Sequence, residues 1–166
     1  MRAYNFDNYM YENDDFLIFV AAGNSGGGNS FNSVGSPGTA KNIVTVGASH
    51  SYGDDLANGD LGPNYIASFS SRGPTHAGRK KPEIIGTGKW ILSAGANPNV
   101  IGECDTGNIP IPGSSSEGVV SMQGTSMATP IAAGHAALIR QYFENGFYPT
   151  GEQKASNSME PSGALV

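Results

Sequence analysis

Two apolar segments without any alternation of polar and apolar residues set the fold class of this chain. They cover residues 16–22 and 43–48, and a polar segment rich in glycine, serine and asparagine follows each of them. A strand with one face in water alternates in polarity, so these segments indicate strands that are buried on both faces. The sequence therefore predicts an α/β fold with a mostly parallel sheet flanked by helices.

A helix rich in small residues is predicted near the C-terminal end of the chain. Five residues recur at steps of three and four, with alanines in the gaps, and they are Met127, Ile131, Gly134, Leu138 and Tyr142. Pro130 has no N–H group and is tolerated only in or near a first turn, so the helix begins close to Ser126. Gly146 and Pro149 provide a stop. Small residues on every side predict a helix that is buried all round.

The length of 166 residues is enough for one domain and too short for two ordinary ones. We predict that residues 1–149 form one domain or part of one, with the end of a helix in residues 1–13 and a short apolar segment at 90–94. Residues 95–118 have the composition of a long loop. Residues 150–166 are polar and are typical of a tail or of the start of a following segment.

Charge and composition exclude several classes of function. The formal net charge of −5 argues against binding to nucleic acid or to anionic lipid. No apolar run approaches the roughly 20 residues that a membrane span needs, and the first residues show no secretory signal peptide. The single cysteine, Cys104, excludes an internal disulfide framework and a zinc site with several cysteines.

Ser126 is the first candidate for chemistry, because it follows a Gly-Thr pair and stands at the start of the predicted helix. Free backbone N–H groups and the positive end of the helix dipole can stabilise a negative tetrahedral intermediate there. The same position also suits an ordinary helix cap. A nucleophile needs a base, and two of the three histidines, His50 and His76, fall in polar loops predicted to be exposed. The third, His135, lies too far along the helix for its ring to reach the Ser126 hydroxyl.

Asn24 closes the first apolar strand, where an amide can donate to a ligand at the carboxyl edge of a sheet. The alternative interpretation is an ordinary turn residue. Glycines 26–28 are not followed by the lysine of a phosphate-binding loop, so no nucleotide cofactor is expected. The acidic loop residues lack calcium-loop spacing, and we assign no metal to them; they are Asp54, Asp55, Asp60, Glu103 and Asp105.

Four motifs occur in one order along the chain. They are AAGNSG at 21–26, SPGTA at 36–40 with its strand at 43–48, SFSSRGP at 68–74 and GTSMATP at 124–130. This combination resembles the C-terminal half of the catalytic domain of subtilisin-like serine proteases, the subtilases of peptidase family S8, over about residues 10–145. The resemblance implies part of a subtilisin-like three-layer fold and peptide-bond hydrolysis through an acyl-enzyme.

The resemblance also implies catalytic roles, with Ser126 as the nucleophile. Asn24 would give the side-chain donor of the oxyanion hole and the Ser126 backbone N–H the second donor. In subtilases the triad runs Asp, His, Ser, yet neither an Asp-Ser/Thr-Gly nor a His-Gly-Thr segment precedes Ala21. Thr87 also replaces the proline of the usual K-P-D-I-x-A-P-G segment. We therefore expect a fragment that is inactive alone and whose partner is the missing N-terminal half of the same domain.

The same resemblance implies a primary specificity pocket for a peptide or protein substrate. Ala21, Ala22 and Gly23 would form one wall and Gly35 the floor, leaving room for a large apolar P1 side chain. The Ser36–Pro37 peptide would be cis, and the full-length protein would be secreted or extracytoplasmic.

Two alternatives stay open. One is a non-catalytic subtilase remnant that binds peptides or packs within a larger assembly. The other is an unrelated serine hydrolase such as an esterase, although no apolar strand runs directly into Ser126 as a nucleophile elbow requires.

Overall fold

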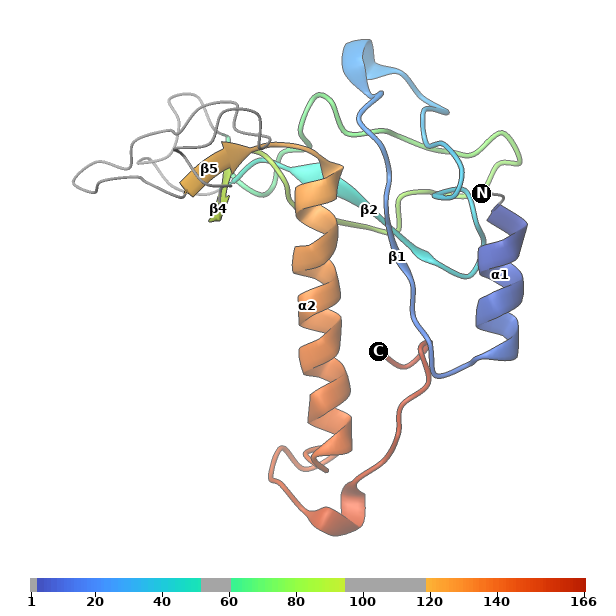
Figure 1. Cartoon of the computed structure of the whole chain (residues 1–166), viewed down its shortest axis with the longest axis vertical. Helices are drawn as coiled ribbons and strands as arrows, with labels where there is room; N and C mark the ends of the chain where they lie inside the picture. Colours follow the sequence, from blue (N-terminus) through green and yellow to red (C-terminus); the bar gives the residue numbers. More distant parts are fainter. Residues whose placement is uncertain (1–2, 52–60, 95–118) are drawn as a thin grey trace, which may run out of the picture.

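The computed structural model of the chain describes residues 3–51, 61–94 and 119–166 (Figure 1). Its helices and strands, in chain order, are α1 (Ala3–Glu12), β1 (Phe19–Ala21), β2 (Val44–Ser49), β3 (Ile84–Thr87), β4 (Ile91–Ala94), β5 (Val119–Met122) and α2 (Thr125–Glu144). Two short 3₁₀ turns, Gly27–Asn29 and Ala155–Asn157, complete the described structure.

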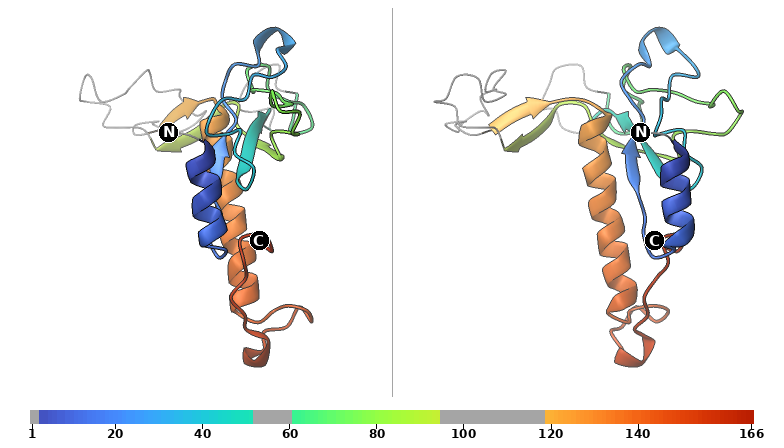
Figure 2. Two further views of the ribbon diagram at one scale, coloured as in Figure 1. Left: turned by 90° about the vertical axis from the view of Figure 1, so that its right-hand side faces the viewer. Right: turned by 45° about the vertical axis from the view of Figure 1, so that its right-hand side comes forward.

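Strands β1, β2 and β3 form a parallel sheet in that order, with Val46 of β2 paired to Ala21 on one side and to Ile84 on the other. Strands β4 and β5 form a separate antiparallel pair. The two longer helices lie on opposite sides of β1 (Figures 1 and 2). The predicted α/β class with a parallel sheet and flanking helices is therefore confirmed.

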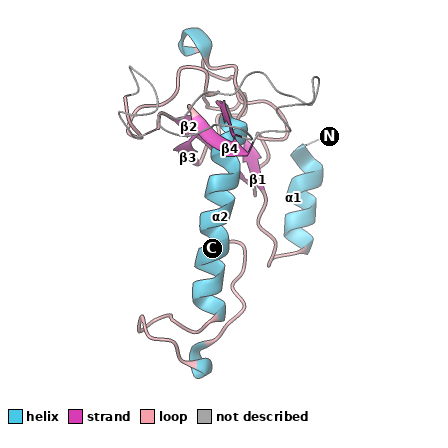
Figure 3. Ribbon diagram, turned by 60° about the vertical axis from the view of Figure 1, so that its left-hand side comes forward, coloured by secondary structure: helices cyan, strands magenta, loops and turns pink. Residues whose placement is uncertain are grey.

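The core lies where α2 crosses the parallel sheet (Figure 3). It contains a cluster of four residues with no exposed surface: Val46 and Ala48 of β2, Ala128 of α2, and Ala67 from the loop between β2 and β3. The helix approaches closely because Gly86 lies in β3 and Gly88 directly follows it: a Cβ on Gly88 would come within 2.8 Å of the Ala48 Cβ and 2.7 Å of the Gly124 carbonyl oxygen. The core thus holds the first turn of α2 against the carboxyl ends of β2 and β3.

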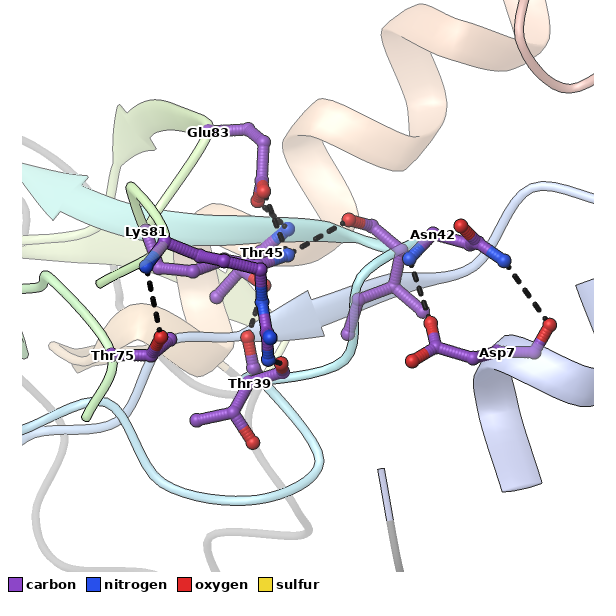
Figure 4. Close-up of polar contacts among 10 residues, drawn as sticks. Asp7, Thr39, Asn42, Thr45, Thr75, Lys81 and Glu83 are labelled. Atoms are coloured by element: carbon purple, nitrogen blue, oxygen red, sulfur yellow. Dashed lines mark hydrogen bonds and ion pairs between the residues drawn. The ribbon is translucent and has the colours of Figure 1, made fainter. Parts of the chain in front are cut away.

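An ion pair between a buried lysine and a partly exposed glutamate connects the segment before β3 to the start of β2 (Figure 4). Lys81 has a side chain only 1% exposed, and its Nζ lies 2.7 Å from Glu83 Oε1 and donates to the Ile43 carbonyl at 3.1 Å. Glu83 Oε2 accepts from the Thr45 N–H at 2.8 Å. A buried ammonium is tolerated only where a partner charge and acceptors surround it, as they do here.

The predicted helix is confirmed, since α2 begins at Thr125, one residue before the expected start, and ends at Glu144. The stop at Gly146 is confirmed by its left-handed φ of 74°, which favours glycine. Pro130 is the sixth residue of the helix, just past the first turn, so it withholds an N–H only from the Ser126 carbonyl. The β3 strand was not predicted from the sequence.

The first apolar segment differs from its prediction. Only Phe19–Ala21 of residues 16–22 form a strand, and all three are half-buried, so the expected burial on both faces is wrong for β1. In contrast, residues Thr45, Val46 and Ala48 of β2 are fully buried. The difference follows from position, because β2 lies between two strands and β1 lies at the edge of the sheet.

The prediction of a helix buried all round is also wrong for the described chain. On α2, Leu138 is 64% exposed and Ile139 is 43% exposed, and on β3 Ile84 and Ile85 are 42% and 45% exposed. These residues, with Tyr142, make up a surface that we call the open apolar face. Next to it, a groove of about 700 Å³ runs between α2, β1 and β3. Small alanines therefore fit α2 to the sheet on one side, while its larger apolar residues remain uncovered.

Residues 150–166, expected to be a polar tail, follow a defined path back towards β1. The Gly163 N–H donates to the Asp14 carbonyl at 2.7 Å, and Pro161 is fully buried. The C-terminus lies between α2 and the segment that leads into β1 (Figure 1), and Val166 lines the groove beside Leu17. The end of the chain thus covers part of the apolar surface next to the sheet edge.

Candidate active site

The candidate site forms where the carboxyl end of β1 meets the N-terminus of α2. Strand β1 ends at Ala21, and the chain leaves it through Ala22 and Gly23 to reach Asn24. Gly23 has a φ of 104°, which an L side chain rarely adopts. Its N–H donates to the Thr125 hydroxyl at 3.1 Å, so the loop after β1 is bonded directly to the first residue of α2.

The Asn24 side chain is held by two hydrogen bonds from a single residue. Its Oδ1 accepts from the Thr125 backbone N–H and from the Thr125 Oγ1–H, both at 3.0 Å. Thr125 is only 1% exposed, so its own position is set by the core. An amide oxygen with two donors aimed at it fixes which end of the side chain is oxygen, and the Asn24 Nδ2 group is left to donate in the other direction.

Ser126 is the second residue of α2 and is exposed. The N-cap residue is Gly124, which makes no side-chain cap, and Asn24 accepts the first helical N–H instead. The cap interpretation of Ser126 is therefore wrong. Because the first N–H groups of a helix have no acceptor within it, the Ser126 N–H can bind a ligand oxygen at the positive end of the helix dipole.

Gly124 brings the amide and the serine together. It has φ 156° and ψ 161°, a backbone conformation essentially limited to glycine. A Cβ here would lie 3.3 Å from Asn24 Nδ2 and 3.7 Å from the Ser126 backbone nitrogen. The Gly124 N–H donates to the Gly88 carbonyl at 2.8 Å, which anchors it to the end of β3. Two potential donors to one anion, the Asn24 amide and the Ser126 N–H, thus flank the same glycine.

Comparison with known proteins identifies the family. The profile of the subtilase family, Peptidase_S8, matches residues 2–159. The chain belongs to the subtilase family.

Subtilase relatives with assigned names are serine proteases. Serine protease AprX of Bacillus subtilis is 41% identical over 75% of this chain and 26% of AprX, and the serine protease/ABC transporter B family protein tagD of Dictyostelium discoideum is 31% identical over 96% of this chain and 12% of tagD. Among solved structures, the S41 psychrophilic protease superposes with a TM-score of 0.52 at 31% identity, over 81% of this chain and 37% of that protein. The chain therefore spans about a quarter or less of the two named relatives.

The residues expected to line the specificity pocket of this subtilase segment cluster at the loop after β1 and at Gly35. Ala22 is 2% exposed, whereas Ala21 and Gly23 are half-buried. Gly35 is exposed, and a Cβ added to it would meet nothing within 4 Å. The Ser36–Pro37 peptide that follows is cis, as the resemblance implied.

One of the three histidines, His50, does not lie as the sequence predicted. His76 is exposed as expected, but His50 is only 7% exposed. The prediction for His50 is wrong because its backbone N–H donates to Tyr65 and its Nδ1 accepts from the Leu61 N–H, which fold the loop over it. His135 lies nine residues along α2 from Ser126, which is roughly 13 Å along the helix axis, and its ring contacts the Ile131 carbonyl.

Three other sequence expectations concern ligands and membranes. The acidic residues considered for calcium, and Cys104, lie outside the described residues. Within the described ranges, no group of three or more histidine, cysteine, aspartate or glutamate side chains could hold a metal ion. No helix in those ranges has the length and apolar character of a membrane span.

Sequence reasoning missed the residue that orients Asn24. Thr125 was quoted only as part of the GTSMATP motif, and its bonds to Asn24 join residues 101 apart in the chain. The motif order could have pointed to this contact, since both motifs were assigned to one site.

Proposed function

We propose that this chain carries the nucleophile and the oxyanion hole of a serine endopeptidase. The observation that supports it most strongly is the pair of Thr125 hydrogen bonds that turn the Asn24 amide nitrogen away from the helix, beside Gly124 and next to Ser126. A donor that is held before the reaction stabilises a developing oxyanion without reorganising at that moment. An ordinary turn asparagine would bond within its own loop.

In the proposed reaction, Ser126 Oγ attacks the carbonyl carbon of the scissile peptide bond while its proton passes to a base. The carbonyl oxygen becomes an oxyanion that accepts from Asn24 Nδ2 and from the Ser126 N–H. Collapse breaks the C–N bond, the leaving amine takes the proton from the base, and an ester on Ser126 remains. Water then attacks the ester and gives a proton to the base; as the acyl C–O bond breaks, the base returns that proton to Ser126 Oγ, which releases the acid product and the free serine.

The base and the acid that orients it come, in this proposal, from a segment that is not part of this sequence. The sequence holds no His-Gly-Thr or Asp-Ser/Thr-Gly segment before Ala21. We call the assembly of this chain with such an N-terminal segment the completed enzyme. Its substrates are peptides or proteins, with an apolar P1 side chain that occupies the open space beside Gly35. From the family resemblance, we also propose that the full-length protein is secreted or extracytoplasmic.

The open apolar face is the surface on which the missing segment packs in this proposal. It consists of uncovered side chains on α2 and β3, and in the described sheet the edge of β1 that faces away from β2 is also unpaired. Apolar surface removed from water contributes roughly 25 cal/mol per Å² to binding, so covering the exposed side-chain surface of Leu138 and Ile139 would favour association. A strand edge that offers unpaired N–H and C=O groups further favours addition of another strand.

The decisive experiment compares labelling by a fluorophosphonate probe in the isolated chain and in the completed enzyme, with casein hydrolysis measured in parallel. We expect negligible labelling and turnover for the isolated chain. The completed enzyme should be labelled and active, and Ser126→Ala should abolish both signals. Robust, Ser126-dependent labelling of the isolated chain would contradict the need for a missing half. Reading the coding DNA directly upstream of Met1 identifies the natural source of the acid and base.

The surface proposal has a test of its own, because one substitution should have opposite effects in two settings. In the isolated chain, Leu138→Glu removes exposed apolar surface and should reduce self-association without lowering Tm. In the completed enzyme the same change buries a charge and should lower stability by several kcal/mol. Equal tolerance in both settings would mean that the face stays uncovered. Lys154→Glu, at an exposed residue outside this face, serves as the control.

The non-catalytic remnant is the second candidate function, favoured by the absence of the acid and base motifs from the sequence. It predicts that a completed enzyme shows no probe labelling while it still binds peptide. Family membership excludes the unrelated esterase.

A further inference from the structure

The loop that carries Asn24 is fastened on the side away from α2 by the turn at residues 67–71. Three hydrogen bonds connect them: Ser71 N–H to the Gly23 carbonyl at 2.8 Å, Ser25 N–H to Ser71 Oγ at 3.1 Å, and Gly26 N–H to the Phe69 carbonyl at 2.8 Å. The turn itself is bonded to β2 through Ala67 and Ala48. The loop is therefore braced against the central strand of the sheet.

Ser71 is the residue of that turn that makes hydrogen bonds on both sides of Asn24. Its N–H donates to the carbonyl of Gly23, the residue before Asn24, and its hydroxyl accepts from the N–H of Ser25, the residue after Asn24. Ser71 therefore holds the peptide units on both sides of Asn24. Ser71 is 1% exposed, and water therefore cannot replace its hydroxyl. The fit is close, since a Cβ on Gly23 would lie 2.9 Å from Ser71 Oγ.

We propose that Ser71 is a positioning residue for the oxyanion donor Asn24, an inference that rests on the proposed function. Thr125 sets the rotation of the Asn24 side chain, and Ser71 sets the backbone from which that side chain projects. A donor acts on an oxyanion only within about 2.7–3.1 Å of it, and a displacement of about 1 Å can cost roughly 100-fold in rate. Ser71 never touches the substrate and acts through Asn24 alone.

The neighbouring serine offers a matched control. Ser70 is also 1% exposed, and its hydroxyl accepts one backbone N–H, from Ala48 in β2, at 3.0 Å. Its hydrogen bond therefore supports the sheet and not the Asn24 loop. Removing either hydroxyl leaves one backbone N–H without its acceptor, the buried N–H of Ala48 in Ser70→Ala and the part-buried N–H of Ser25 in Ser71→Ala, so the Ser70 variant should lose at least as much stability. Only the Ser71 variant should lose catalytic rate.

The experiment measures kcat and KM of the completed enzyme for Ser71→Ala and Ser70→Ala. We expect Ser71→Ala to lower kcat by about 10-fold with KM within about twofold, and Ser70→Ala to keep kcat within about twofold. If both variants lower kcat equally, or neither does, Ser71 is only structural and the proposal is overturned. If Ser71→Ala does not fold, Ser71→Cys, which keeps the volume but weakens the acceptor, replaces it in the same comparison.

A double substitution tests whether Ser71 acts through Asn24. In an Asn24→Ala background, Ser71→Ala should lower kcat by less than about twofold further, because there is no donor left to position. Independent, multiplicative losses would overturn the proposal. Failure of the proposed function is visible separately, since the unsubstituted completed enzyme would then show no Ser126-dependent labelling or turnover, whereas failure of this inference leaves the Ser126 and Asn24 effects intact.

Discussion

Asn24 has two functions in this structure, and one substitution can separate them. Its Oδ1 accepts both Thr125 donors, whereas its Nδ2 is the proposed oxyanion donor. Asn24→Asp keeps the acceptor oxygen and the shape but replaces the donor with a carboxylate oxygen. Asn24→Leu removes both the acceptor and the donor. Both variants should therefore lose activity, Asn24→Asp at least as much as Asn24→Leu because its carboxylate also repels the oxyanion, and they should differ in stability.

The structure sets the size of each effect. In Asn24→Leu the N–H of Thr125, a residue 1% exposed, loses its acceptor, which should cost about 1–3 kcal/mol. This cost lowers Tm by about 2–12 °C in a domain of 150–250 residues. In Asn24→Asp the helix end gains a negative charge, worth about 0.3–1 kcal/mol of stabilisation, so Tm should hold or rise. Loss of the donor should lower kcat by about 100- to 1000-fold in both, a magnitude taken from a subtilisin.

The assay is steady-state hydrolysis of a chromogenic peptide by the completed enzyme, with Tm measured on the same samples. We expect KM to change little in Asn24→Leu, because an oxyanion donor bonds the transition state far better than the ground-state carbonyl. Ser126→Ala gives the background rate. If Asn24→Leu lowers Tm by many degrees while both variants keep kcat within about threefold, Asn24 only caps α2, and the reasoning fails.

Three further predictions concern other parts of the molecule. Gly35→Val should shift the P1 preference from aromatic or long aliphatic residues towards alanine, because the new side chain fills open space; a substrate library dominated by Lys, Arg or Asp at P1 would contradict this pocket. Gly124→Ala should lower stability by about 1–3 kcal/mol and kcat further, since its φ is 156° and its Cβ would crowd Asn24 Nδ2; a wild-type kcat would argue against this packing. Glu83→Gln should destabilise by about 1–3 kcal/mol, more than Lys81→Met, because it leaves the Lys81 ammonium, 1% exposed, without the charge of its partly exposed partner; denaturant unfolding with the reverse order would refute the ion-pair reasoning.

Local patterns in the sequence were sufficient to predict α2, which presents Ser126, and the central strand β2. The three- and four-residue steps after Ser126, with Gly146 as the stop, predicted α2 to within a residue at its start. The apolar segment at 43–48 predicted β2, because a central strand is buried on both faces. These predictions succeeded since helix and strand periods, caps and breakers act over a few neighbouring residues. The family resemblance added Ser126 and Asn24 as a pair.

Other features depended on contacts between distant segments. No local pattern indicates that Thr125 orients Asn24, or that Ser71 encloses the same loop 46 residues from Ser25. His50 was expected to be exposed and is buried, because Leu61 and Tyr65 fold over it. Burial and hydrogen-bond partners are properties of the packed molecule, so residue type alone could not predict them.

The sequence by itself determined the class of fold, the helix that presents Ser126 and the motifs that mark the family. The tertiary structure decided which side of α2 is covered and which way the Asn24 amide faces. The physical reason is that parallel strands are joined by long crossings, which bring the ends of β1 and the start of α2 together only after the sheet has formed. A side chain at that junction is oriented by neighbours about 100 residues away, and its geometry exists only in the folded chain.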